Sequence, residues 1–362
     1  MAPFKSTDDS FSASKVSKVT DITFSKGIAG ITTGTVSGTH AHFVPGNGYE
    51  YLIFTGPGSF TVTESGLADI MIVGGGGGGS GCPPTRTEGG GGGGAGGVVH
   101  QYWVNLPSFP GTYSITIGAG GAGGSHLNPT ALGSNGIPST FSSPTINNIT
   151  AYGGGRGGSY PLAYGADGGC GGGGGNGPSC YRGNVSVPGG IYHEDITIPS
   201  SASYLIYMGY PGGDGVTATS QTGGGGGGAG QAGSPSRRDI SAGPGGNGGD
   251  GLSAFDGDNG VPTSYGEAYS AGGDQTVSHP SAPLFSPSVP DPAIFKGRYF
   301  GGGGGGSSYG VGGLGGGGSS PGFTGASGLV NTGGGGAGGR QDGYSGGSGG
   351  SGIAIIRYKT SS

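Results

Sequence analysis

His40 and His42 are the residues of this sequence best arranged to hold a metal ion. A single residue separates them, so on a β-strand both imidazole rings would point to the same side. One chain would offer two nitrogen ligands, whereas three chains around a threefold axis would offer six, enough for an octahedral transition metal. The pair therefore predicts a metal site only in a trimer, and two surface histidines near a turn are the favoured alternative.

Motifs for catalysis and for phosphate binding are missing from the sequence. No serine lies in a nucleophile elbow, and no pair of carboxylates has a diagnostic spacing. A phosphate-binding loop needs Gly-Lys-Ser or Gly-Lys-Thr, and neither occurs. Asp256, Asp258 and Asn259 resemble the start of a calcium loop, but the later glutamate does not line up, which favours a solvated acidic turn. We therefore expect no enzyme activity and no cofactor.

Glycine dominates the composition of this chain and must therefore determine much of its backbone structure, because it supplies 101 of the 362 residues. It occurs in uninterrupted blocks, such as Gly74–Gly79, Gly89–Gly94, Gly171–Gly175, Gly223–Gly228 and Gly301–Gly306. Collagen needs glycine at every third position, so blocks of this kind exclude it. A flexible linker is the other common interpretation of such a composition. The blocks alternate with segments typical of strands, however, and we therefore expect them to be ordered.

Short β-strands are predicted on both sides of the glycine-rich region. The expected strands are Tyr49–Thr55, Ser59–Thr63 after a turn at Pro57-Gly58, Asp69–Val73, Val98–Asn105, Thr112–Ile117, Ser139–Ser142, Thr145–Tyr152 and Ile353–Lys359. Weaker candidates are Asp21–Phe24, Asp195–Ile198 and Tyr204–Met208. The last strand is strongly apolar and far along the chain from its partners, so the two ends of the glycine-rich region must come together.

The expected fold class is mainly β plus extended chain, with almost no α-helix. We expect an attachment segment at residues 1–45 and a glycine-rich domain at residues 46–362. Within that domain, residues 49–152 and 353–359 would form a jelly-roll-like β-sandwich. The glycine segments would project from it as one large insertion, mainly at residues 153–352.

Glycine blocks can form an ordered bundle of polyglycine II helices. This left-handed extended helix has three residues per turn and no internal hydrogen bonds, so every backbone N–H and C=O points outward to neighbouring helices. Only glycine allows such close packing, because a Cβ atom would hold the chains apart. Ala95, Ala229 and Ala337 each follow a run of glycines, and we expect alanine to fit at the edge of the bundle.

Charge and cysteine content exclude several other classes of protein. The net charge is −5, which argues against nucleic-acid binding. Residues 1–9 contain no apolar signal-peptide region, and no apolar run is long enough to span a membrane. Three cysteines leave an odd count. A Cys170–Cys180 disulfide is conceivable, but free buried thiols are favoured.

The order of several short sequence segments along the chain resembles that of a glycine-rich domain of phage tail fibres and other virion proteins. The resemblance begins at Tyr51–Ser65, passes through Ser114–Gly121, and closes at Gly349–Tyr358. It is also distantly similar to the glycine-rich domain of anaplastic lymphoma kinase-type receptors. The phrase Gly38–His42 resembles the metal-binding Gly-x-His-x-His motif of T-even phage fibre tips, although that motif is repeated there and occurs once here.

The resemblance implies a structural protein of the virion surface, with a homotrimeric tail fibre or adhesin as the leading form. Residues 1–45 would bind other virion proteins, and a host glycan or outer-membrane protein would be the receptor. A capsid fibre or decoration protein is the first alternative, and an extracellular-matrix or ice-binding protein is the second. The segments Tyr181–Met208 and Gln275–Phe300 interrupt the glycine pattern longest and are the predicted contact loops. Their candidate contact residues are Tyr192, His193, Tyr204, Tyr207, Phe285, Phe295 and Tyr299.

Overall fold

The structure is a computed structural model in which twelve strands and no helix are found in the described residues. The described residues are 30–46, 48–84, 87–109, 111–128, 130–143, 147–161, 163–177, 180–185, 204–216, 222–236, 244–254, 267–268, 298–340 and 343–360. The strands are β1 (Thr32–Phe43), β2 (Tyr49–Glu64), β3 (Gly66–Val73), β4 (Val98–Leu106), β5 (Thr112–Thr116), β6 (Ser139–Ser142), β7 (Ile149–Ala151), β8 (Tyr204–Met208), β9 (Leu252–Ser253), β10 (Glu267–Ala268), β11 (Arg298–Phe300) and β12 (Ile353–Lys359). The expected strands at Asp21–Phe24 and Asp195–Ile198 lie outside the described residues.

The last strand of the chain lies in the middle of the main sheet. The strand order is β7-β6-β5-β2-β12-β3-β4-β8, with β1 paired to the other edge of β2, and every pairing in it is antiparallel. β12 joins β2 to β3, with Ile355 opposite both Ile53 and Met71. The prediction that Ile353–Lys359 brings the ends of the glycine-rich region together is therefore confirmed, as is the strand at Tyr204–Met208.

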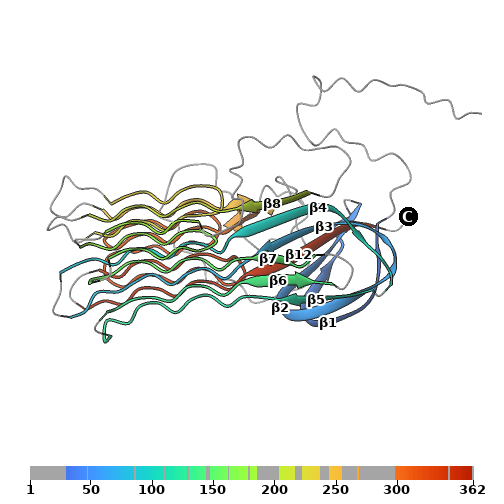
Figure 1. The fold of residues 1–362 in the computed structure, drawn as a ribbon, viewed down its shortest axis with the longest axis horizontal. Coiled ribbons are helices and arrows are strands. Elements are labelled where there is room, and N and C mark those ends of the chain that lie inside the picture. The colour runs from blue at the N-terminus through green and yellow to red at the C-terminus, as the bar shows by residue number, and fades with distance from the viewer. Residues whose placement is uncertain are drawn as a thin grey trace, which may run out of the picture.

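The main sheet curls into a nearly closed barrel, in place of the two packed sheets expected for a jelly roll (Figure 1). Its curvature brings β6 and β7 against β3 and β4. Alternate residues of each strand point to opposite faces, so the sheet carries two apolar clusters. Leu52, Phe54 and Phe60 belong to the first, whereas Tyr51 and Ile53 belong to the second.

The predicted turn at Pro57-Gly58 is wrong, because β2 runs unbroken through both residues from Tyr49 to Glu64. The strand changes its neighbour at this point. Glu50 to Phe54 pair with β12, whereas Gly58 to Thr61 pair with β5. Proline lacks an N–H and glycine lacks a side chain, and here the two residues allow a change of partner within one strand.

The glycine-rich segments extend side by side from one end of the curled sheet (Figure 1). They begin directly after β3 at Gly74, return into β4 at Gly97, and leave again after β5 at Gly118. The segments are thus threaded between the strands of the sheet, and those at residues 74–97 and 118–137 precede residue 153. We call their assembly the bundle. Its end near the sheet is the base, and the opposite end, at Cys82, Tyr309, Phe323 and Tyr344, is the free end.

Candidate functional site

The backbone hydrogen bonds of the bundle repeat every three residues. Along Gly74–Cys82, the first series of amides donates to Gly97, Gly94 and Gly91, at distances of 2.8–3.0 Å. The second series donates to Ile137, Ser134 and Ala131, and the third donates to Gly350, Gly347 and Tyr344. Consecutive amides therefore face three different neighbouring segments. A β-strand would alternate between two directions instead.

Close backbone contacts exclude side chains from the centre of the bundle. A Cβ added at Gly93 would lie 2.1 Å from the carbonyl oxygen of Gly77. At Gly304 it would lie 2.1 Å from the carbonyl oxygen of Gly336. These distances are far below van der Waals contact, and the obstructing atoms are backbone. The requirement for glycine at these positions is thus steric.

Ala95, Ala229 and Ala337 are completely buried, so the expectation that alanine would sit at the edge of the bundle is wrong. Ala95 and Ala229 belong to the second apolar cluster, together with Val98 and Phe300. Their methyl groups fill the space where the bundle meets the outer face of the sheet. Alanine in these phrases therefore marks the base of two segments, and the packing needs its methyl group.

Segments at the periphery of the bundle show a pattern that the sequence analysis missed. Gly322, Gly325 and Gly328 are buried, while the two residues between successive glycines are half-buried or exposed. Gly118, Gly121 and Gly124 repeat the arrangement, with the exposed Ala119 and Ala122 between them. One position in three is buried against the bundle and is glycine in both stretches, while at least one of the two positions between carries a side chain. This local G-x-x spacing was the signal in the sequence that could have revealed the period.

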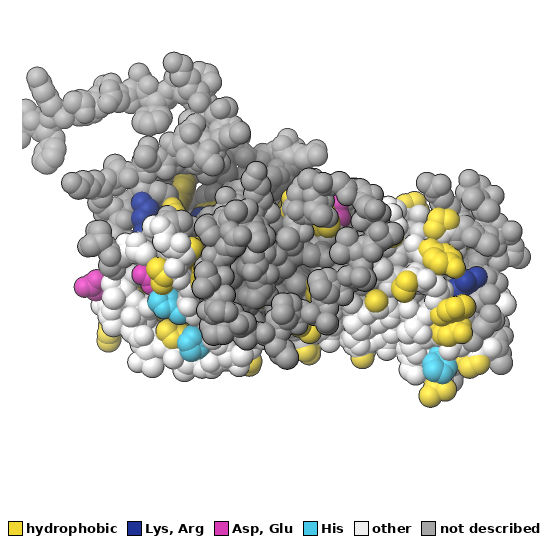
Figure 2. All heavy atoms as spheres, turned by 180° about the vertical axis from the view of Figure 1, so that it is seen from behind, with side chains coloured by type: hydrophobic (Ala, Val, Ile, Leu, Met, Phe, Trp, Pro, Cys, Tyr) yellow, Lys and Arg dark blue, Asp and Glu magenta, His cyan; other side chains and the backbone are white. Residues whose placement is uncertain are grey.

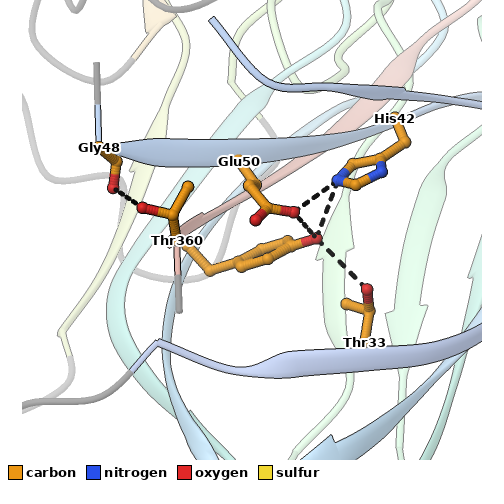
Figure 3. A network of polar contacts seen from close by, with 6 residues as sticks. Thr33, His42, Gly48, Glu50 and Thr360 are labelled. Atoms are coloured by element: carbon orange, nitrogen blue, oxygen red, sulfur yellow. Dashed lines mark hydrogen bonds and ion pairs between the residues drawn. The ribbon is translucent and has the colours of Figure 1, made fainter. Parts of the chain in front are cut away.

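His42 on β1 belongs to a polar network with residues of β2 and β12 (Figure 3). Its Nε2 lies 2.7 Å from Oε2 of Glu50 on β2. The hydroxyl of Tyr358 on β12 donates to the same oxygen at 3.3 Å, and Thr33 Oγ1 lies 3.4 Å from that hydroxyl. A carboxylate accepts hydrogen bonds only, so Nε2 of His42 carries the proton in this contact. The network ties β1, β2 and β12 together.

Burial keeps the Tyr358 hydroxyl protonated. It raises the pKa of Tyr358 to about 12, with the hydrogen bond to Thr33 lowering the pKa and the charge of Glu50 raising it. Tyr358 is only 3% exposed. This side chain is therefore a hydrogen-bond donor at neutral pH, and its role in the network is to hold strands together.

His40 takes no part in this network. Its Nδ1 contacts the carbonyl oxygen of Gly38 at 2.9 Å, and its ring lies 5.9 Å from that of Phe54. Within the described ranges, no three His, Cys, Asp or Glu side chains are grouped to hold a metal ion. A metal bound by His42 would have to displace Glu50 or take it as a further ligand. The trimeric metal site remains a prediction.

The predicted contact residues fall into two groups. Tyr192, His193, Phe285 and Phe295 lie outside the described residues, as do Asp256, Asp258 and Asn259 of the acidic turn. The other three are on strands: Tyr204 and Tyr207 on β8, and Tyr299 on β11. Tyr207 packs against the first apolar cluster and Tyr299 is half-buried. These strands lie near the base, so the structure does not bring them together with the free end.

Short connections at the free end expose several large side chains that the sequence analysis did not select as contacts. Tyr309 is 57% exposed and Phe323 is 58% exposed. The amide of Arg340 donates to the carbonyl of Phe323, which places both residues beside one another at this end. Because these connections are short, they interrupt the glycine pattern much less than the two long segments that were predicted as contact loops.

All three thiols are free, with Cys82 and Cys170 buried and Cys180 half-buried. Burial raises the pKa of Cys170 to about 12, so this thiol stays protonated and unreactive. Cys170 packs in the second apolar cluster at the base, beside Ala95 and Met208. In the part of the chain that the structure describes, nothing helical is long and apolar enough to cross a bilayer.

Comparison with known proteins supports the interpretation of the whole chain as one glycine-rich unit. No curated protein matches the sequence significantly. A protein-family model described as a glycine-rich domain matches residues 54–359, which include most of the curled sheet and the whole bundle. That span begins within β2 and ends at the last residue of β12, two strands that pair directly. The chain belongs to this glycine-rich domain family.

Proposed function

We propose that the glycine segments form a polyglycine II bundle. The support is the three-residue period of donors along Gly74–Cys82, because three residues per turn is the defining geometry of this helix. Neighbours run in both directions. The amides of Gly92 and Ala95 donate to Gly224 and Gly227 of a parallel neighbour, whereas those of Gly74 and Gly77 donate to Gly97 and Gly94 of an antiparallel one.

Amide hydrogen exchange along residues 118–124 tests this proposal. Gly121 and Gly124 donate to Gly76 and Gly79 and should exchange slowly. In the described structure the amides of Ala119, Gly120 and Ala122 have no backbone acceptor, so they should exchange at least about 100-fold faster. A two-residue alternation would favour a β-strand, and uniformly fast exchange would favour a flexible coil. Either result would overturn the bundle.

For the whole chain, we propose a structural protein of the virion surface, with a tail fibre or adhesin as the leading form. The observation that carries this proposal is the separation of the two ends of the molecule. Gly30 forms a bridge with Leu67 and lies against the backbone of Lys359, so both ends of the described chain meet at the sheet. The bundle carries the turns that hold Tyr309 and Phe323 away from them. A protein that displays a binding surface needs an attachment region at one end and exposed loops at the other, and the sheet and the free end meet these two needs.

The proposed partners follow the same polarity. Residues 1–45 contact other virion proteins, and the free end faces the host surface. Three copies assembled through the sheet would bring three His40-Ala-His42 strands together and complete the metal site predicted from the sequence.

Labelling of purified particles of the encoding virus tests the location and the role together. Antibody fragments raised against the free end should bind intact particles and reduce adsorption to host cells. Fragments that bind heads instead of tails would replace the adhesin with the alternative, a capsid fibre or decoration protein. A chain that is absent from particles and works as a free secreted protein would favour the matrix or ice-binding class.

A further inference from the structure

An arginine held by aromatic rings occupies the free end of the bundle. The guanidinium carbon of Arg340 lies 5.8 Å from the ring centre of Phe323 and 5.9 Å from that of Tyr309. The Phe323 ring packs on Tyr344, with ring centres 4.9 Å apart. We call Tyr309, Phe323, Arg340 and Tyr344 the arginine cluster. Both distances lie within the range of cation–π interactions, so the two rings contribute to holding the guanidinium at this end.

The Arg340 side chain has no hydrogen-bond or ion-pair partner among the described residues. Its Nε is buried and unsatisfied. By contrast, Arg357 at the sheet is paired with Asp69, and Arg182 with Asp214. A buried guanidinium nitrogen without an acceptor is unfavourable, and an incoming anion would remove that penalty. Charge and geometry therefore favour a ligand with a planar carboxylate, which guanidinium binds through two parallel hydrogen bonds.

The Tyr309 backbone is held in a conformation that tyrosine disfavours. Ser308 and Tyr309 have φ angles of 63° and 66°, the combination of a type I′ turn, in which Asn-Gly is usual. Tyr309 is nevertheless exposed, so packing in a core does not explain why a bulky ring stands there. Strain of this kind at an exposed aromatic side chain is typical of binding sites.

The surface continues from the arginine cluster to His126. Nδ1 of His126 lies 3.0 Å from Oγ of Ser345, the neighbour of Tyr344, and Leu127 beside it is 79% exposed. Figure 2 shows hydrophobic, basic and histidine side chains gathered at the end of the molecule remote from the sheet. The patch thus combines exposed rings with cationic or polar groups.

We infer that the arginine cluster binds an acidic saccharide. Arg340 takes the carboxylate of one sugar unit, while the exposed parts of the Phe323 and Tyr309 rings contact the C–H groups of the saccharide. This inference deepens the proposed display function, since it names the class of host-surface ligand and the residues that contact it. A phosphate would satisfy the charge of Arg340, but it would leave the exposed ring faces without a partner.

Calorimetry on the full chain tests the inference with three carboxylated probes: a galacturonic acid tetramer, a hyaluronan tetramer and an α2,8-linked sialic acid tetramer. At least one should bind, and a neutral galactose tetramer should bind at least about tenfold more weakly. Affinity should fall as salt is raised. Failure of all three probes, or equal binding of the neutral tetramer, would overturn the inference. Binding of anionic phospholipid vesicles without any acidic tetramer would do the same and would point to a membrane.

Matched variants locate the site. Arg340→Gln should weaken binding of the successful tetramer at least about tenfold, and Phe323→Ala should weaken it similarly. Arg182→Gln removes an exposed arginine that already has a partner and should change affinity less than about twofold. Thermal unfolding of each variant shows whether the bundle is intact. Unchanged affinity in a folded Arg340→Gln variant would refute the assignment. Because binding is measured on the isolated chain, adsorption and particle labelling remain independent tests of the proposed function.

Discussion

At the scale of single residues, the bundle depends on the absence of a Cβ atom at its central glycines. Gly93→Ala places a Cβ 2.1 Å from the carbonyl oxygen and 2.6 Å from the carbonyl carbon of Gly77. Backbone cannot rotate away as a side chain can, so two segments must separate and their hydrogen bonds must lengthen. We expect a loss of about 3 kcal/mol in the free energy of unfolding, measured by denaturant titration with the fluorescence of Trp103 as the probe.

Gly97→Ala is the matched control, because Gly97 ends the same segment. Its added Cβ would meet Gly169 Cα at 3.1 Å and Tyr152 O at 3.5 Å. A shift of a few tenths of an ångström relieves that contact, and the loss should be less than half that of Gly93→Ala. Equal stability losses would mean that the bundle adapts to side chains, against the steric account.

A second residue-scale prediction concerns the buried ion pair of the sheet. Asp69 Oδ2 lies 2.6 Å from Nη2 of Arg357, and Asp69 Oδ1 accepts the amide of Trp103 at 3.0 Å. Trp103 has a φ of 54° where the register of β3 and β4 shifts, so the carboxylate also holds a strained turn of the backbone. Asp69→Ala removes the carboxylate that neutralises the largely buried guanidinium of Arg357 and should cost about 3 kcal/mol in the free energy of unfolding.

The exposed pair of Arg182 and Asp214 provides the comparison. Its atoms are 3.5 Å apart, and both side chains are 47% exposed. Arg182→Ala should therefore cost less than about 1 kcal/mol. Denaturant titrations of both variants under the same conditions check the difference. A small loss for Asp69→Ala would show that Arg357 finds another partner or water.

At the scale of elements, the contact of β1, β2 and β12 depends on a protonated tyrosine. The folded-state pKa of Tyr358 is raised to about 12 from the ordinary value of 10.0. Above pH 10 the unfolded chain loses this proton before the folded chain does, so the stabilisation is complete below pH 10 and falls as pH rises towards 12. By pH 11 the wild-type chain should lose about 1 kcal/mol relative to pH 9 through this group.

Tyr358→Phe isolates that effect from the ionisation of the other tyrosines. The variant loses the hydrogen bond to Glu50 and should be about 1 kcal/mol less stable at pH 8. The difference from wild type should then shrink between pH 9 and pH 11, as followed by urea titration at each pH. A constant difference over this range would show that the Tyr358 hydroxyl titrates normally.

At the scale of the whole molecule, the first 45 residues include both the proposed attachment segment and a strand of the main sheet. β1 (Thr32–Phe43) pairs with β2, and Ile31 is 1% exposed in the first apolar cluster. Deleting residues 1–45 should therefore cost at least about 2 kcal/mol from the loss of Ile31 alone, and it leaves one edge of β2 open to self-association. Thermal unfolding and light scattering measure both effects.

Deleting only residues 1–28 retains Ile31 and β1, so this variant tests attachment without removing part of the sheet. Loss of the shorter variant from particles, with its unfolding midpoint unchanged, would assign docking to the segment before Gly30. If the variant is incorporated into particles at the wild-type level, the sheet itself must contain the attachment surface.

Much of the sheet was predictable, because its strands carry their own periodic signal. Ser139–Ser142 and Ile353–Lys359 match the expected strands to the residue. The turn predicted at Pro57-Gly58 was wrong because proline and glycine occur both in turns and at irregular points within strands. Only the positions of β5 and β12 beside β2 distinguish the two cases. The arginine cluster was not predictable, since its members come from separate short connections that meet only in the folded bundle.

The sequence alone determined that this protein is built from strands and ordered glycine, since alternating apolar residues and side-chain-free blocks leave few other structures open. It also determined that β12 must return to the start of the domain, because a strand so apolar needs buried neighbours. The tertiary structure decided which segments lie beside which. Every glycine offers the same N–H and C=O, so a block cannot specify its partner, and the strands and loops at its two ends set that choice. The same packing brought Arg340 between two rings and left Tyr207 and Tyr299 at the base.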